Sequence, residues 1–155
     1  IAEAAGVSVN SVAGTVIGLH NNSMIPLVNY ATAGGVPIRR LLTGAEILSV
    51  VNKTKDAGTA IVSKLINRSG FYAASNTIAE IIESMVFNKR AVFPLSVWCR
   101  GEYGHHDICL ALPAVVGEGG VHRLVVPDLD EDERRMLDAC VVEMKSEIEK
   151  TASPK

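Results

Sequence analysis

The chain has 155 residues, of which 48% are apolar and 21% are charged, and its formal net charge is −2. Its length and apolar content predict one globular domain that can bury a core without a disulfide or a structural metal, and they exclude a wholly disordered chain. Because 15 basic residues stand against 17 acidic ones, nucleic acid is not expected as a partner. The apolar runs are shorter than the roughly 20 residues of a membrane-spanning helix, so no membrane partner is expected.

The first segment of the chain is typical of the end of a helix, because Ile1 to Ala5 is followed by Gly6. Since the chain opens on isoleucine rather than methionine, we expect that residue 1 is a cut and that a preceding part is missing. The three cysteines, Cys99, Cys109 and Cys140, stand in apolar surroundings. This setting favours buried, reduced thiols and a cytoplasmic protein.

The first half of the chain predicts a strand, a loop and a helix. Val12 to Gly18 is apolar and partly β-branched, which predicts a buried strand that ends just before His20. Residues 20–38 are expected to form loop and irregular structure. The Thr43–Glu46 segment fits a capping box that opens a helix. Around Gly58 we expect this helix to be interrupted before a second apolar pattern begins.

The second half begins with a turn at 67–70, and a third helix is expected from Ala73 on. One face of this helix carries apolar residues at the 3.6-residue period and is expected to be buried: Ile78, Ile81, Ile82, Met85 and Val86. Three β-rich segments follow, with glycine-containing hairpin turns between them: 91–99, 107–116 and 121–126.

A last helix is predicted from the capping pattern of Asp130 and Glu133, whose acids also suit the positive end of the helix dipole. Its expected core face consists of Met136, Leu137, Cys140, Val141, Met144 and Ile148. Residues 150–155 are polar and are expected to form a disordered tail.

The chain contains neither G-x-G-x-x-G nor a Gly-Lys-Ser/Thr phosphate loop, so no nucleotide-binding fold is predicted within it. The candidates for proton chemistry are the four histidines, because imidazole can gain and lose a proton near neutral pH: His20, His105, His106 and His122.

Three of these histidines favour structural interpretations. His105-His106-Asp107 resembles a ligand cluster, but neighbouring strand residues point to opposite faces and no second ligand pair has matching spacing. We therefore predict a solvated hairpin corner and no metal site. His122 opens a strand and is expected to be exposed or at an edge.

His20 follows an apolar strand and could be aimed into a cleft, where it would serve as a general acid and base. Spacing alone favours a capped or hydrogen-bonded structural histidine at this position, so both interpretations stay open on the residues alone.

Several segments resemble one family in the same order. Residues 16–27, with His20 at their centre, resemble the active-site histidine segment of the lactate and malate dehydrogenases. Residues 54–62 resemble that family's broken central helix, and the Gly101–Gly117 region resembles its hairpin. Together with Ser69–Ala73 and the closing helix, the resemblance extends over most of the chain.

The resemblance implies an α+β fold in which antiparallel sheets pack with long helices. Residues 1–149 would form the C-terminal, substrate-side domain of such a dehydrogenase, followed by the tail. NAD would be bound mainly by an N-terminal domain that is absent from this chain, and the isolated chain would be inactive. The resemblance further implies a small 2-keto or 2-hydroxy acid as substrate and a homodimer or homotetramer.

The resemblance also assigns residues to the site. It implies that His20 exchanges a proton with the substrate oxygen. Ser69 matches a small hydroxyl position that lines the pocket, while Asn21, Asn22 and Met24 belong to the site loop. The family usually has Gly and Asp where this chain has Asn21 and Asn22. Asparagine tolerates the left-handed backbone, so Asn21 is expected to keep the turn, whereas Asn22 replaces an anion by a neutral amide.

The segment Met24–Thr32 with Gly35–Ile38 is more similar to the malate branch that shares the lactate dehydrogenase architecture. Malate and oxaloacetate are therefore favoured over lactate and pyruvate. Two alternatives stay open at this point: a lactate dehydrogenase, and a non-catalytic family member that serves in assembly or ligand binding, which Asn21 and Asn22 motivate.

Overall fold

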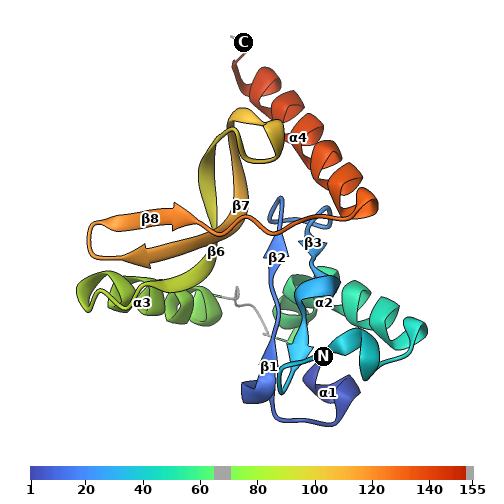
Figure 1. Cartoon of the computed structure of the whole chain (residues 1–155). Helices are drawn as coiled ribbons and strands as arrows, with labels where there is room; N and C mark the ends of the chain where they lie inside the picture. Colours follow the sequence, from blue (N-terminus) through green and yellow to red (C-terminus); the bar gives the residue numbers. More distant parts are fainter. Residues whose placement is uncertain (65–70, 153–155) are drawn as a thin grey trace. The chain divides into compact units, whose positions relative to one another are not determined.

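The computed structural model of the protein describes residues 1–64 and 71–152 (Figure 1). In this part of the chain there are four α-helices and several short and long strands, and every strand pair of known register is antiparallel. The predicted α+β class is thus confirmed. The chain divides into two units, Ile1–Val16 with Pro26–Thr77 and Ile17–Ile25 with Ile78–Lys155.

The first unit begins with α1 (Ala2–Ala5), which Gly6 closes in the left-handed conformation at φ 65°. This is the helix end that the sequence predicts. A small sheet then has the order β1-β4-β5, with strands Val12–Ala13, Thr32–Ala33 and Val36–Pro37.

The strand predicted from Val12 to Gly18 is not continuous. It stops after Ala13 and resumes as β2 (Val16–Ile17), which pairs with β3 (Ile25–Pro26). Gly14 lies at the break. A glycine weakens a strand because its backbone loses more conformational entropy on folding and it has no side chain to pack.

The core of the first unit gathers around short 3₁₀ turns rather than around a sheet. Ala31, Ile38 and Leu42 are buried there. Partly buried apolar side chains pack against them: Ile1, Ala5, Val28, Ile47 and Val50. The last two come from one face of α2, as their spacing predicts.

The helix α2 (Gly44–Lys64) opens with the predicted capping box. The backbone N–H of Thr43 donates to Glu46 Oε2 at 2.7 Å, and the N–H of Glu46 donates to Thr43 Oγ1 at 3.3 Å. The predicted interruption at Gly58 is wrong, because the helix runs through it to Lys64. An isolated glycine costs a helix about 1 kcal/mol relative to alanine, but it keeps both backbone hydrogen-bonding groups.

The helix α3 (Phe71–Val86) is already helical at Phe71, the first residue described after the gap at 65–70, two residues before the predicted start. Its apolar stripe is not buried, contrary to prediction: Ile78, Ile82 and Val86 are 56%, 53% and 68% exposed. Ser84 is the one residue of this helix that is fully enclosed. Periodicity shows that a face is apolar, but it does not supply the element that covers the face. The turn expected at 67–70 lies outside the described residues.

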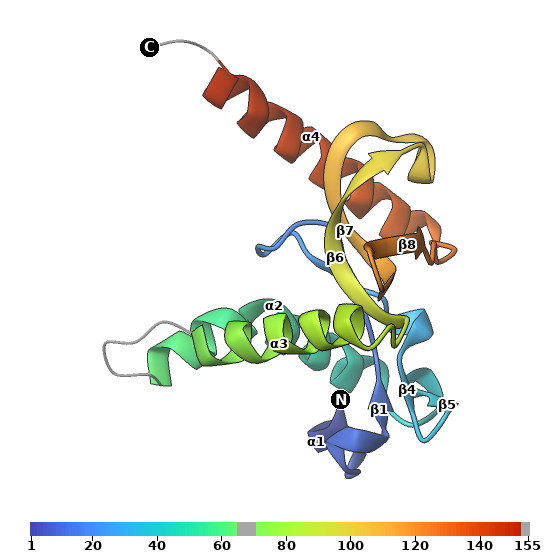
Figure 2. The same ribbon diagram turned by 90° about the vertical axis from the view of Figure 1, so that its left-hand side faces the viewer.

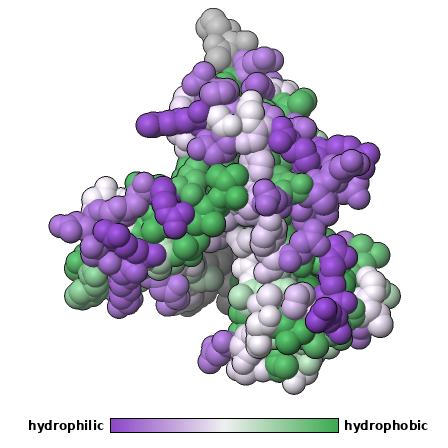
Figure 3. Space-filling model, viewed as in Figure 1, coloured by the Kyte–Doolittle hydropathy of each residue, from purple (hydrophilic) through white to green (hydrophobic). Residues whose placement is uncertain are grey.

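The second unit is built on a sheet of order β6-β7-β8, formed by β6 (Ala91–Arg100), β7 (His106–Gly117) and β8 (Gly120–Leu124). The three predicted strands are confirmed within one or two residues at each end. The central strand β7 is buried over most of its length. Apolar side chains also reach the surface over this sheet (Figure 3), among them Val92, Trp98 and Val121.

The helix α4 (Glu131–Ala152) begins at the predicted cap, since Asp130 Oδ1 accepts from the backbone N–H of Glu133 at 2.9 Å. It lies beside β7 in both views of the chain (Figures 1 and 2). Leu137, Cys140 and Val141 form its buried face, as predicted.

The ends of the predicted core face of α4 differ from expectation, because Met136 and Ile148 are exposed. The helix also continues through residues 150–152, where a disordered tail was expected, and residues 153–155 lie outside the described part. No helix in the described part is long and apolar enough to cross a membrane.

Candidate functional site

The candidate site is the histidine loop, residues 18–24, which follows β2 in the second unit. Gly18 joins the loop to the sheet by two hydrogen bonds with Ala111 of β7, from Gly18 N to Ala111 O at 3.0 Å and back at 2.9 Å. Gly18 has φ +94°, and a Cβ there would lie 3.3 Å from Cys140 Sγ. Both the backbone conformation and the close approach therefore favour glycine at the start of the loop.

His20 lies two residues beyond this bridge and is exposed. The preceding residue, Leu19, is buried and fixes the chain on the N-terminal side of His20. None of the described residues hydrogen bonds to the His20 imidazole, so the hydrogen-bonded structural role that spacing favoured has no counterpart there. The ring is open to solvent.

The turn after His20 does not depend on a left-handed asparagine, as the sequence had suggested. Positive φ values occur at other residues, and Asn21 is not among them. Asn21 Oδ1 instead accepts from the backbone N–H of Ser23 at 2.8 Å, and Asn21 O accepts from Met24 N at 3.0 Å. This is a side-chain-stabilised Asx turn, which asparagine forms readily and glycine cannot form.

Two residues of α4 hold the loop from the outside of the turn. The carboxylate of Glu143 accepts from Asn21 Nδ2 at 2.7 Å and from Ser23 Oγ at 2.7 Å. Cys140 Sγ donates to the backbone carbonyl of Ser23 at 3.2 Å. Residues 140 and 143 are three apart, so they lie on the same face of the helix.

The remaining predicted site residues have different surroundings. Asn22 is exposed, and no side chain in the described ranges, 1–64 and 71–152, hydrogen bonds to its amide. Met24 is half-buried at the end of the loop. Ser69 lies outside the described residues.

The structure thus brings Asn21 and Ser23 of this loop together with Cys140 and Glu143. The last two were missed as site residues, because Cys140 was assigned to the core only and Glu143 lies on the polar side of a helical pattern. No local signal pairs position 143 with position 21, since 122 residues separate them.

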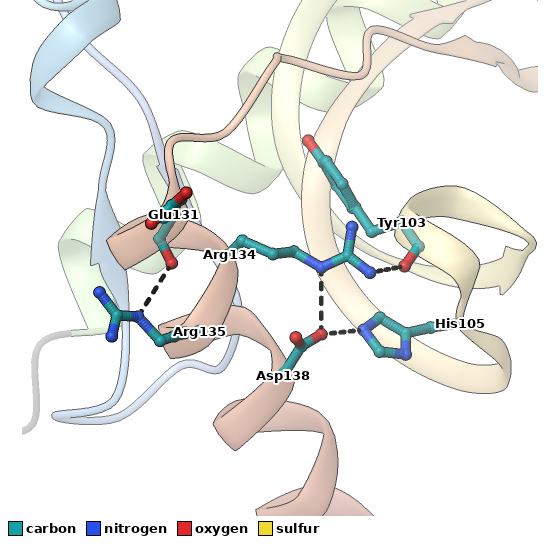
Figure 4. A network of polar contacts seen from close by, with 6 residues as sticks. All are labelled: Tyr103, His105, Glu131, Arg134, Arg135 and Asp138. Atoms are coloured by element: carbon teal, nitrogen blue, oxygen red, sulfur yellow. Dashed lines mark hydrogen bonds and ion pairs between the residues drawn. The ribbon is translucent and has the colours of Figure 1, made fainter.

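A second polar cluster joins the β6–β7 hairpin to α4 (Figure 4). Asp138 accepts from His105 Nε2 at 2.8 Å and from Arg134 Nε at 3.2 Å. The Arg134 guanidinium also donates to the carbonyl of Tyr103, and the Tyr103 hydroxyl donates to Pro127 O at 2.6 Å. The prediction of a solvated corner is wrong for His105, whose side chain is only 17% exposed.

This cluster shifts the pKa of its central carboxylate, Asp138. Desolvation alone would raise the pKa of Asp138, but the hydrogen bonds from His105 and Arg134 outweigh it and hold the pKa below its ordinary value. Asp138 is therefore ionised at neutral pH and joins the His105 ring to α4.

The other chemistry-bearing residues stay apart from one another. Within the described ranges no group of three or more His, Cys, Asp or Glu side chains is placed to hold a metal ion. His106 and His122 are exposed, the latter as predicted. All three cysteines are free. Burial, followed by the charge of Glu102, raises the pKa of the Cys99 thiol, which keeps it protonated and unreactive.

Comparison with known proteins identifies the class. The family model for the lactate/malate dehydrogenase alpha/beta C-terminal domain matches residues 1–154. The chain is 40% identical over 154 residues to the malate dehydrogenase of Xanthobacter autotrophicus (strain ATCC BAA-1158 / Py2), covering 96% of this chain and 48% of that protein. It is 34% identical over 146 residues to the malate dehydrogenase of Shouchella clausii (strain KSM-K16), covering 94% and 46%.

Solved structures agree with this result. The malate dehydrogenase from Aeropyrum pernix has a TM-score of 0.89 at 34% identity, over 96% of this chain and 50% of that one. The lactate dehydrogenase from Eimeria maxima, solved with NADH and oxamate, has a TM-score of 0.90 at 31% identity, over 99% and 50%. The chain spans about half the length of the curated relatives it matches.

The fold and the matches define the chain as a lactate/malate dehydrogenase alpha/beta C-terminal domain. It belongs to the lactate/malate dehydrogenase family, and the relatives reported above by sequence are malate dehydrogenases.

Proposed function

We propose that the intact protein is an NAD-dependent malate dehydrogenase, which interconverts malate and oxaloacetate, and that residues 1–149 are its substrate-side domain. The observation that carries this proposal is an accessible imidazole, His20, on a loop that is fixed by the sheet at Gly18 and by α4 at Glu143. The malate dehydrogenase relatives support the choice of substrate.

The residues of this chain do not fit a dinucleotide-binding fold. The strand pairs of known register among residues 1–64 and 71–152 are antiparallel, and the chain has no G-x-G-x-x-G sequence. We therefore assign NAD, the hydride carrier of the proposed reaction, mainly to an N-terminal domain outside this chain. It follows that the isolated chain is expected to be inactive.

His20 would manage the proton of the reaction. In its protonated form, the imidazole would donate a proton to the carbonyl oxygen of the 2-keto acid as that carbon is reduced. In the opposite direction, the neutral ring would accept the proton of the 2-hydroxy acid. Ser69 is the proposed hydroxyl of the substrate pocket, and Asn21, Asn22 and Met24 would shape the loop beside it.

The same proposal includes a homodimer or homotetramer of the intact protein. It also includes a cytoplasmic location, which the three free thiols support.

The test is NADH oxidation by the full-length protein, with oxaloacetate and pyruvate offered separately under matched conditions. We expect a higher kcat/KM for oxaloacetate, and His20→Ala should lower kcat by about 10²–10⁴. His122→Ala, at another exposed histidine, is the matched control and should leave turnover unchanged. A preference for pyruvate would instead favour a lactate dehydrogenase, which the Eimeria maxima match also suggests.

A non-catalytic family member is the second candidate, because a neutral amide stands at Asn22. Folded full-length protein that turns over neither acid would favour it. Asn22→Asp then restores the anion without disturbing the turn, whereas Asn21→Gly would remove the hydrogen bonds to Ser23 and Glu143. A large gain in turnover from Asn22→Asp would identify a decayed catalytic site.

A further inference from the structure

We infer that Glu143 of α4 is a positioning residue for His20, which it orients by holding the side chains of Asn21 and Ser23. The part of the inference that concerns the orientation of the imidazole rests on the function proposed for His20. The anchoring of the loop can be tested without turnover.

The geometry uses both oxygens of one carboxylate. Glu143 Oε1 lies 2.7 Å from Asn21 Nδ2, and Glu143 Oε2 lies 2.7 Å from Ser23 Oγ. Hydrogen bonds to an ionised acceptor are shorter and stronger than those between neutral groups. Because the two donors stand on either side of Asn22, a rotation of this turn would break both bonds at once.

The other attachments of the loop do not duplicate this one. The bridge to Ala111 fixes the backbone at Gly18, and Cys140 fixes the carbonyl of Ser23. Between these two points, Asn21 is the neighbour of the histidine whose side chain hydrogen bonds to another element.

The histidine depends on this support. No described residue hydrogen bonds to the His20 ring, so in this chain its direction follows from the backbone of the loop. Within the described ranges no basic side chain forms an ion pair with Glu143. Its carboxylate therefore contacts the loop without competition from a cation. Both oxygens have the neutral donors described above, and removal of the carboxylate would release the turn.

The experiment compares Glu143→Ala with Glu147→Ala in the full-length protein. Glu147 stands one turn further along α4, and its carboxylate contacts Lys150 rather than the loop. Two quantities are measured: amide hydrogen exchange in peptides that cover residues 18–24, and kcat and KM for the better 2-keto acid across pH. Glu143→Gln, which keeps one acceptor oxygen, is the conservative variant and also serves if the alanine variant does not fold.

We expect Glu143→Ala to speed exchange in the loop about tenfold and to lower kcat by about ten- to a hundredfold, because small misplacements of a reacting group are costly. KM should change less than kcat, and Glu143→Gln should recover part of the rate. Ser23→Ala should add little in the Glu143→Ala background, since its acceptor is already gone. Glu147→Ala should resemble the wild type.

Equal loop exchange in the Glu143 and Glu147 variants would overturn the inference. Faster exchange with an unchanged kcat and pH profile would also overturn it, since the loop would then move without affecting the histidine. If the wild type turns over neither acid, the proposed function fails, while faster exchange in Glu143→Ala would still confirm that Glu143 anchors the loop.

Discussion

The helices α3 and α4 carry similar sequence patterns and reach opposite outcomes. Each has apolar residues at helical spacing, but the stripe of α4 is buried at Leu137 and Cys140, while that of α3 is exposed at Ile78 and Ile82. The difference lies in the partner, because α4 packs along the buried strand β7. An amphipathic pattern therefore specifies a helix and its apolar side, and the burial of that side depends on another element.

The largest expected effect tests the buried side of the comparison. Leu137 is fully enclosed on α4, so Leu137→Ala removes buried methyl groups and leaves a cavity. We expect a loss of about 2–5 kcal/mol in the free energy of unfolding, measured by urea denaturation. Val142→Ala, at an exposed apolar position of the same helix, is the control. Equal losses in the two variants would contradict the assigned buried face.

Ser84 is the exception on α3 and gives the next largest effect. Its hydroxyl donates to Val116 O at 2.8 Å and accepts from Ala91 N at 3.3 Å, and the side chain is fully buried. Ser84→Ala leaves two backbone groups without this partner, so we expect a loss of about 1–2 kcal/mol in the free energy of unfolding. Thr77→Ala, which removes an exposed hydroxyl from the same helix, should cost less. A neutral Ser84→Ala would show that water replaces the hydroxyl.

Polar contacts of α4 give a smaller, pH-dependent effect. The pKa of Asp138 is lower in the folded state than its ordinary value of 3.8, so the ionised carboxylate stabilises the fold above about pH 4. This contribution is lost as pH falls through the lowered folded pKa. Because the side chain is 47% exposed, we expect less than about 1 kcal/mol.

The measurement for this prediction is urea denaturation of Asp138→Asn and wild type from about pH 3, near the ordinary carboxyl pKa, to about pH 7. The variant should be less stable at pH 7, and the difference should shrink toward the acid end. Asp132→Asn, at a more exposed ion pair of the same helix, is the control. A difference that is constant with pH would show that ionisation of Asp138 contributes nothing.

Local patterns predicted those parts of the fold whose physics is local. Both capping sequences, at Thr43 and at Asp130, open helices because the cap residue and the carboxylate three positions later satisfy each other's backbone donors. The β6–β8 hairpins also follow from glycine-bounded apolar runs. Gly58 was misjudged because a glycine weakens a helix without removing any of its backbone hydrogen bonds.

The candidate site was predicted only in part, for the same physical reason. His20 and its loop are contiguous, so the family resemblance can point to them as site residues from a short segment. Glu143 and Cys140 meet that loop only after α4 has packed on the sheet, and no pattern in the sequence encodes this contact. Asn21 was expected to keep the turn through its backbone, whereas its side chain does so.

The smallest expected effect tests the exposed side of the comparison. Ile82→Ala on α3 removes methyl groups that are largely in water, and alanine has the higher helix propensity, so the two contributions nearly cancel. We expect a change within about 0.5 kcal/mol in urea denaturation of the 155-residue chain. A loss above about 2 kcal/mol would show that the apolar face of α3 is covered in solution. Repeating the measurement at several protein concentrations would then decide whether a second copy covers this face. If it does, the difference in stability between wild type and variant would grow with protein concentration.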